Sequence, residues 1–191
     1  MPVAEVNADP PIKVKISNGN KNRLEKVKDK SQKIAEAIAT VLNIEVEIID
    51  NNLVRIAGTG IVRNDIGIRL LRGMVNKHVL KTGKSVFIKQ PGFHKICQEC
   101  PLSEHCFYKA YIVYPLEIEK EIIGTISLVA FNEEQRETLL KNPESLIEFI
   151  GRMAELISTK VLEMEVNAEK IVVANELQAI VDSVDEGVMA I

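Results

Sequence analysis

Two neighbouring runs of apolar and β-branched residues decide the fold: Ala110-Tyr111-Ile112-Val113-Tyr114-Pro115-Leu116-Glu117-Ile118 and Glu121-Ile122-Ile123-Gly124-Thr125-Ile126-Ser127-Leu128-Val129-Ala130-Phe131. Runs of this composition are typical of buried strands. Only Glu119 and Lys120 separate them, and a two-residue connection predicts an antiparallel hairpin. We expect the rest of the chain to pack around this hairpin.

Three further strands are expected upstream of the hairpin. Residues 44–48 alternate apolar and polar side chains, which predicts a half-buried strand. A turn at residues 50–52 leads to a returning strand over 53–58. Residues 85–88 form another short apolar run. The sheet is therefore predicted to be antiparallel.

Helices are predicted where apolar residues recur at steps of three and four. The first begins at Lys21, with its seam at Leu24, Val27, Ser31, Ile34, Ile38 and Val41. The second covers 65–80, with inward residues Ile66, Leu70, Leu71, Met74 and Val79. A long helix runs from Ser145, with its seam at Leu146, Ile150, Met153, Ile157 and Met164. Helices on one face of an antiparallel sheet predict an α+β fold with a long C-terminal helix.

All three cysteines lie in one polar loop, residues 93–106, with the spacing C-x2-C-x5-C: Cys97, Cys100 and Cys106. Two thiolates separated by two residues can bind the same metal ion. Iron–sulfur proteins use similar runs, including a proline after a ligating cysteine, as Pro101 follows Cys100. The spacing therefore predicts an iron–sulfur cluster. A zinc site, a thiol/disulfide switch and three inert cysteines are the alternatives that the sequence leaves open.

A closed metal site needs a fourth ligand, which the three thiolates do not supply. The nearest candidates are His94 and His105, followed by Glu99 and Glu104, or a cysteine from a second chain. An odd number of cysteines also argues against a simple disulfide framework.

Composition excludes several classes of protein. The 191 residues, 46% of them hydrophobic, suit one full domain with extensions. A formal net charge of −3 gives no electrostatic reason to bind nucleic acid directly. The N-terminus has no signal-peptide pattern, and no apolar run is long enough to span a bilayer. We expect a cytoplasmic protein, where free thiols persist and clustered cysteines indicate metal or redox chemistry.

The order of elements resembles that of a GAF domain, over residues 21–165. The residues that carry the resemblance are Val79-Leu80-Lys81-Thr82-Gly83-Lys84-Ser85-Val86 and Ile123-Gly124-Thr125-Ile126-Ser127-Leu128. GAF domains often end a helix in a T-G-K-like turn and later contain a strand of the I-G-x-I-x-L type. Residues 1–20 are predicted to be a leader that precedes the domain.

Residues 166–191 are predicted to be a linker helix and the start of a PAS-like domain. The resemblance rests on residues 174–191, in which an L-x-x-I-x-x-S helix precedes an acidic-Gly turn at Glu186 and Gly187 and the beginning of a strand.

A GAF domain with such a cysteine loop, joined by a long helix to a PAS domain, resembles the N-terminal input region of bacterial sigma-54-dependent transcriptional activators. The resemblance implies a non-enzymatic sensor of redox state, oxygen or nitric oxide. It also implies downstream PAS and output domains in the same polypeptide. The long helix and the first helix have near-heptad seams, which predict a homodimer through parallel pairing.

Two alternative functions remain open at the level of sequence. One is a zinc-stapled or small-molecule-binding GAF dimerisation module of a sensor histidine kinase. The other is an enzyme that resembles GAF-fold methionine sulfoxide reductases. The wider cysteine separation of those enzymes disfavours the second alternative.

Overall fold

The computed structural model describes residues 22–70, 73–101 and 103–189. The predicted leader, residues 1–20, lies outside the described residues. A five-stranded sheet with the strand order β2-β1-β5-β4-β3 is the centre of the fold. Its strands, all antiparallel to their neighbours, are β1 (Glu45–Asp50), β2 (Arg55–Gly58), β3 (Val86–Ile88), β4 (Ala110–Ile118) and β5 (Glu121–Ala130).

The predicted central hairpin is confirmed. Strands β4 and β5 pair from Ala110 with Ala130 to Ile118 with Glu121. Their two connecting residues, Glu119 and Lys120, have positive φ angles of 50° and 71°. A two-residue turn with both central residues in this region matches the twist of the flanking strands. The expected strands at the first hairpin and at Val86–Ile88 are confirmed as well.

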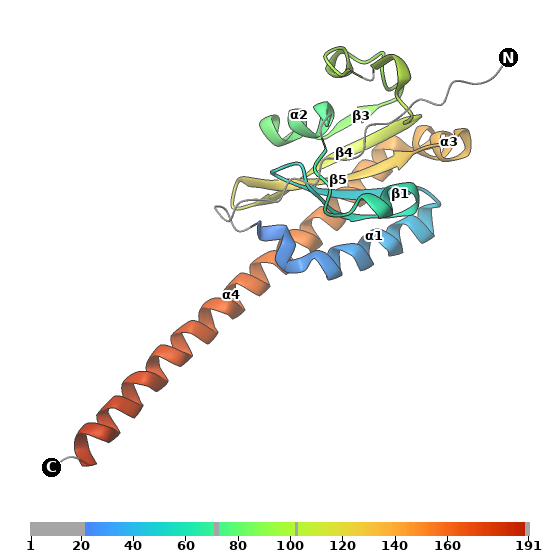
Figure 1. Ribbon diagram of the computed structural model, residues 1–191. Coiled ribbons are helices and arrows are strands. Elements are labelled where there is room, and N and C mark those ends of the chain that lie inside the picture. Colours follow the sequence, from blue (N-terminus) through green and yellow to red (C-terminus); the bar gives the residue numbers. More distant parts are fainter. Residues whose placement is uncertain (1–21, 71–72, 102, 190–191) are drawn as a thin grey trace.

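One face of the sheet is covered by helices α1 (Lys28–Leu42) and α4 (Pro143–Met189), as Figure 1 shows. The short 3-10 helix η1 (Arg23–Val27) precedes α1. The main core lies here and includes Leu24, Ile38, Val46, Ile48, Ile112, Ile126, Leu128, Ile150 and Ile157. The prediction that Val41 belongs to the α1 seam is wrong, because its side chain is 78% exposed near the end of the helix.

The opposite face is also covered, which corrects the prediction that all helices lie on one face. Helix α2 (Met74–Thr82) packs there with Val75 and Val79 against Val113 and Val129 of the sheet. The cysteine loop lies on the same side (Figure 1). Strand β1 is also buried on both faces: Glu47 is only 2% exposed, although its strand was predicted to be half-buried.

The second helix is shorter than predicted. A 3-10 helix, η2 (Gly60–Asp65), is followed by a turn at residues 66–67, and α2 begins only at Met74. The backbone of residues 67–70 pairs with the edge of β2 instead: the Gly67 amide donates to the Arg55 carbonyl at 2.8 Å, and the Leu70 amide donates to the Leu53 carbonyl at 2.7 Å. These bonds replace the intrahelical ones. Ile66, expected to face inward, is 39% exposed, and Leu71 lies outside the described residues.

The last two helices follow the sequence signals closely. Helix α3 (Glu133–Lys141) begins after Asn132, whose side-chain oxygen accepts a hydrogen bond from the Gln135 amide at 2.8 Å. Helix α4 then begins at Pro143. Its predicted seam packs on the domain's own core through Leu146, Ile150, Met153 and Ile157, whereas Met164 is 37% exposed.

Helix α4 continues to Met189, so the acidic-Gly turn expected at Glu186 and Gly187 is helical. No described strand lies beside these residues to pair with the strand that was expected after the turn. The start of a PAS domain therefore stays a prediction, and Ala190 and Ile191 lie outside the described residues. Of the helices that the structure describes, none combines the length and apolar character needed to cross a bilayer.

Candidate functional site

The cysteine loop connects two neighbouring strands, β3 and β4, so both of its ends are fixed in the sheet. Two short 3-10 helices shape the loop: η3 (Lys95–Cys97) and η4 (Ser103–His105). Between them the Cys100 amide donates to the Cys97 carbonyl at 2.9 Å, and the Ser103 amide donates to the Cys100 carbonyl at 2.9 Å. Cys97 and Cys100 therefore occupy one tight turn, as the C-x2-C spacing predicted.

Cys97 is the buried member of the set. Its side chain is 5% exposed and packs in a small apolar cluster with Val75 and Val79 of α2 and Ile88 of β3. Tyr111 packs in the same cluster, and burial together with the neighbouring thiols of Cys97 and Cys106 raises the pKa of Tyr111. Tyr111 is the second residue of β4, so Cys97 packs against the beginning of that strand.

Cys106 and Cys100 are half-buried. The Tyr108 amide donates a hydrogen bond to Cys106, but burial raises the pKa of this thiol, and the nearby Cys97 and Cys100 thiols act in the same direction. The Cys97 and Cys100 thiols therefore lie close enough to Cys106 to affect its titration. None of the three forms a disulfide.

Aromatic contacts fix the C-terminal end of the loop on the sheet. The ring of Tyr108 lies 5.3 Å from the rings of Tyr111 and Phe131, measured between centroids. Phe107 stacks on Phe131 at 6.0 Å. These rings connect Cys106 to the ends of β4 and β5.

The predicted ligand set is only partly brought together. No group of three or more His, Cys, Asp or Glu residues in the described part of the chain is arranged to hold a metal ion. His94 caps η3, because its Nδ1 atom accepts a hydrogen bond from the Ile96 amide at 3.3 Å. Glu99 and Glu104 are exposed, and the imidazole of His105 is outside what the structure describes. Metal binding by Cys97, Cys100 and Cys106 therefore stays a prediction.

Two adjoining clefts separate the cysteine loop from α3, with volumes of about 430 and 530 Å³. Gln90, Phe93 and Arg136 line both of them. Cys106 and Lys109 contribute to the wall of the smaller cleft. A small molecule in this cleft would have access to the Cys106 thiol.

Sequence analysis missed a buried ion pair on the same face of the sheet. The Arg55 guanidinium contacts the Glu47 carboxylate at 2.9 Å, and their side chains are 6% and 3% exposed. Burial raises the pKa of Glu47, and Arg55 opposes that rise by favouring the charged carboxylate. Asp65 also reaches Arg55, at 3.4 Å. Opposite charges on the two strands of a predicted hairpin were the signal that could have revealed the pair.

Other buried polar groups lie on this face. Thr125 of β5 donates a hydrogen bond to the Asn76 side chain of α2 at 3.0 Å. The Ser127 hydroxyl, also on β5, is buried and has no protein partner in the described structure. The surface beneath α2 and the cysteine loop is therefore more polar than the α1 and α4 face.

Comparison with solved structures places this arrangement in a known fold. Residues 122 to 287 of a methyl-accepting chemotaxis protein match the chain with a TM-score of 0.55 and 17% identity, covering 75% of this chain and 95% of that one. The GAF domain of a phosphoenolpyruvate-protein phosphotransferase from Coxiella burnetii matches with a TM-score of 0.50 and 11% identity, covering 77% and 96%. The chain has a GAF fold. No family model matches it.

The GAF domain also has a relative among curated protein sequences. It is 32% identical over 162 residues to a protein of Escherichia coli (strain K12) named as a uric acid sigma-54-dependent transcriptional regulator, UacR. The matched region covers 84% of this chain and 27% of that protein. The chain is thus homologous to part of a sigma-54-dependent regulator and spans about a quarter of its length.

Proposed function

We propose that this GAF domain is the sensory input domain of a sigma-54-dependent transcriptional regulator, with the cysteine loop as its detector. Homology to a regulator of that class supports this output over a histidine kinase. Because the chain covers only 27% of its relative, we propose that PAS and output domains belong to the complete protein. The crowding of all three cysteines into one loop supports a sensor over a methionine sulfoxide reductase.

The positions of the three thiols are the observation that supports the cysteine loop as the detector. Cys97 contacts Tyr111 at the start of β4, and Cys106 lies beside Tyr108 and the wall of an open cleft. In our proposal Cys97, Cys100 and Cys106 hold an iron–sulfur cluster, and oxygen, nitric oxide or a change of redox state alters it. His105 or a group from another molecule would complete the ligand set. Zinc is the alternative metal, in a structural role.

Anaerobic reconstitution with iron and sulfide tests this proposal. We expect brown protein whose visible absorbance fades in air, and each of the Cys97→Ser, Cys100→Ser and Cys106→Ser variants should bind several-fold less iron, because a three-thiolate site rarely survives with two. Ser103→Ala, in the same loop, is the matched control and should keep its iron. Full iron in all three cysteine variants, or a colourless wild type, would show that the cluster is absent; tight zinc in colourless protein would favour the zinc alternative.

The relative's name suggests a second candidate signal, uric acid. The smaller cleft has a volume in the range of ligand sites, and its wall carries the cations of Lys109 and Arg136 as well as the carboxylates of Glu104 and Glu133. Calorimetric titration with urate belongs in the same experiment. Saturable urate binding by metal-free protein would favour an organic effector over the cluster.

We also propose that the domain forms a homodimer, but through a different surface from the predicted one. Ile150 and Ile157 are buried in their own domain, and Leu146 and Met153 are partly buried against the same core. Beyond Glu165, α4 carries the exposed apolar residues Val166, Val173 and Leu177, spaced seven and four residues apart. This spacing is that of a two-stranded coiled coil, and a second copy of α4 would cover the stripe.

Light scattering at several concentrations checks the dimer. Val173→Glu places a charge in the proposed seam, and we expect it to weaken dimerisation at least about tenfold. Val172→Glu is the matched control, because Val172 is also exposed but points about 120° away from the stripe. A monomeric wild type, or equal effects of the two variants, would contradict the proposal.

A further inference from the structure

Helix α4 leaves the domain at Glu165. Ile157 and Val161 are fully buried, and Glu165 is half-buried. From Val166 to Val181 the side chains are exposed. Any movement of the sheet that is to reach the second half of α4 must therefore act at or before this exit point.

The short helix η1 is attached to the sheet near this exit point through Asn22 and Leu24, the two neighbours of Arg23 in the sequence. The Asn22 side chain donates a hydrogen bond to the Asp50 carboxylate at the end of β1, at 2.5 Å. Leu24 is fully buried, and its side chain lies against Gly124 of β5. Arg23 is therefore carried by a backbone that is anchored on the sheet.

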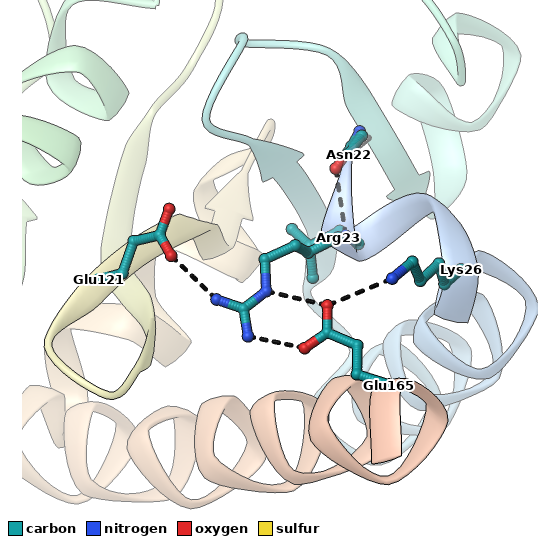
Figure 2. Close-up of polar contacts among 6 residues, drawn as sticks. Asn22, Arg23, Lys26, Glu121 and Glu165 are labelled. Atoms are coloured by element: carbon teal, nitrogen blue, oxygen red, sulfur yellow. Dashed lines mark hydrogen bonds and ion pairs between the residues drawn. The ribbon is translucent and has the colours of Figure 1, made fainter. Parts of the chain in front are cut away.

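Arg23 uses this position to hold two elements at once, as Figure 2 shows. Its Nη1 atom contacts the Glu121 carboxylate at 2.9 Å, at the first residue of β5. Its Nε and Nη2 atoms donate to the two carboxylate oxygens of Glu165 at 3.1 and 2.8 Å. Lys26 approaches Glu165 as well, at 3.3 Å, but has no contact with Glu121 in the structure.

We propose that Arg23 is a positioning residue that couples the β4–β5 turn to the exit of α4. A guanidinium is planar and its donors have fixed directions, so the two carboxylates cannot move independently while both are held. Strand β4 begins at Ala110, just after the cysteine loop, and ends at the β4–β5 turn, beside which Arg23 contacts Glu121. We call the ion pairs of Arg23 with Glu121 and Glu165 the clamp. The clamp lies at the C-terminal end of β4, whereas Cys97 and Cys106 lie near the N-terminal end of that strand.

The clamp rests on the proposed function only for the role of α4 as the output element. The existence of the clamp follows from the geometry alone. If it couples the turn to α4, the coupling must act in both directions. If Arg23 couples the two carboxylates, loosening either one must loosen the other element by thermodynamic linkage. A variant at a residue that contacts Glu165 but leaves both Arg23 ion pairs in place should not have this effect on the turn.

Amide hydrogen exchange of the 191-residue chain tests the coupling. Glu121→Gln should accelerate exchange in α4 over residues 162–168 by about five- to tenfold, although Glu121 is not on that helix. Glu165→Gln should accelerate exchange at residues 119–121 to a similar extent. Lys26→Gln is the matched control: it removes the Lys26–Glu165 pair but keeps both Arg23 ion pairs, so exchange in the turn should stay within about twofold of wild type.

Two results would overturn the inference. One is unchanged α4 exchange in Glu121→Gln, which would show that Arg23 transmits nothing from the turn. The other is a Lys26→Gln effect on the turn as large as that of Glu165→Gln, which would indicate general destabilisation. Neither result requires metal or urate, and residues 162–165 precede the proposed dimer seam, so failure of the clamp and failure of the proposed function are distinguishable.

Discussion

Replacing Gly124 by alanine should destabilise the domain by about 3–4 kcal/mol, because no space exists for the added methyl group. A Cβ atom at this position would lie 2.4 Å from the Ile49 carbonyl oxygen of the paired strand and 2.6 Å from a methyl carbon of Leu24. The carbonyl belongs to the backbone of β1, which cannot shift without disturbing its pairing with β5. Relief on the other side would push η1, and Arg23 with it, away from the sheet.

Thermal and urea unfolding measure this effect, and we expect the melting temperature to fall by about 6–12 °C. Gly73→Ala is the matched control. A Cβ at Gly73 would meet only side-chain atoms of Leu70 and Asn76, at 3.3 Å or more, and the backbone φ of −67° suits alanine. The control should remain within about 1 kcal/mol of wild type. Equal stability of the two variants would show that β1 and η1 accommodate the methyl group.

Structure that depends mainly on residues adjacent in the sequence was predicted correctly. The β4–β5 hairpin, for example, follows from two apolar runs and a two-residue connection. The second helix was predicted too long because residues 67–70 pair with the edge of β2, a contact between separate segments that local periodicity does not contain. The α4 seam was read correctly as apolar, but its partner is the domain's own sheet.

The residues that form the candidate site could be predicted from the sequence, whereas their arrangement in space was less predictable. Clustering in sequence was enough to place Cys97, Cys100 and Cys106 in one loop. It did not reveal that Cys97 would be buried against α2 while Cys106 opens onto a cleft, because both facts depend on how the loop folds back over the sheet. Glu47 was missed for the same reason, since only a cover on the second face of β1 buries it.

The buried ion pair of Glu47 and Arg55 gives the second large expected effect on stability. We expect Arg55→Met to destabilise the domain by about 3–5 kcal/mol near neutral pH, because it leaves the Glu47 carboxylate buried without its cation. The Glu47 and Arg55 side chains are 3% and 6% exposed, so water cannot replace the lost partner. By contrast, Arg152→Met removes one partner of an exposed pair with Glu155, with side chains 67% and 70% exposed, and should cost less than about 0.5 kcal/mol.

The cost of Arg55→Met should also depend on pH, with a definite sign. Burial already raises the pKa of Glu47, and loss of Arg55 removes the main influence that lowers it. The folded variant therefore binds a proton at pH values where the unfolded chain, with an ordinary glutamate pKa of about 4.3, does not. Stability is then greatest at low pH and is lost as the pH rises through the raised pKa of the folded state.

Urea unfolding at about pH 5 and about pH 7.5 checks this, with each variant compared with wild type at the same pH. The deficit of Arg55→Met should shrink at the lower pH, and the double variant Glu47→Gln, Arg55→Met should show no such change because it has no carboxyl at this position to titrate. Arg152→Met should show the same small deficit at both pH values. A deficit of Arg55→Met that is independent of pH would mean that Glu47 stays charged in the folded variant, and that water or a neighbouring group reaches it when Arg55 is gone.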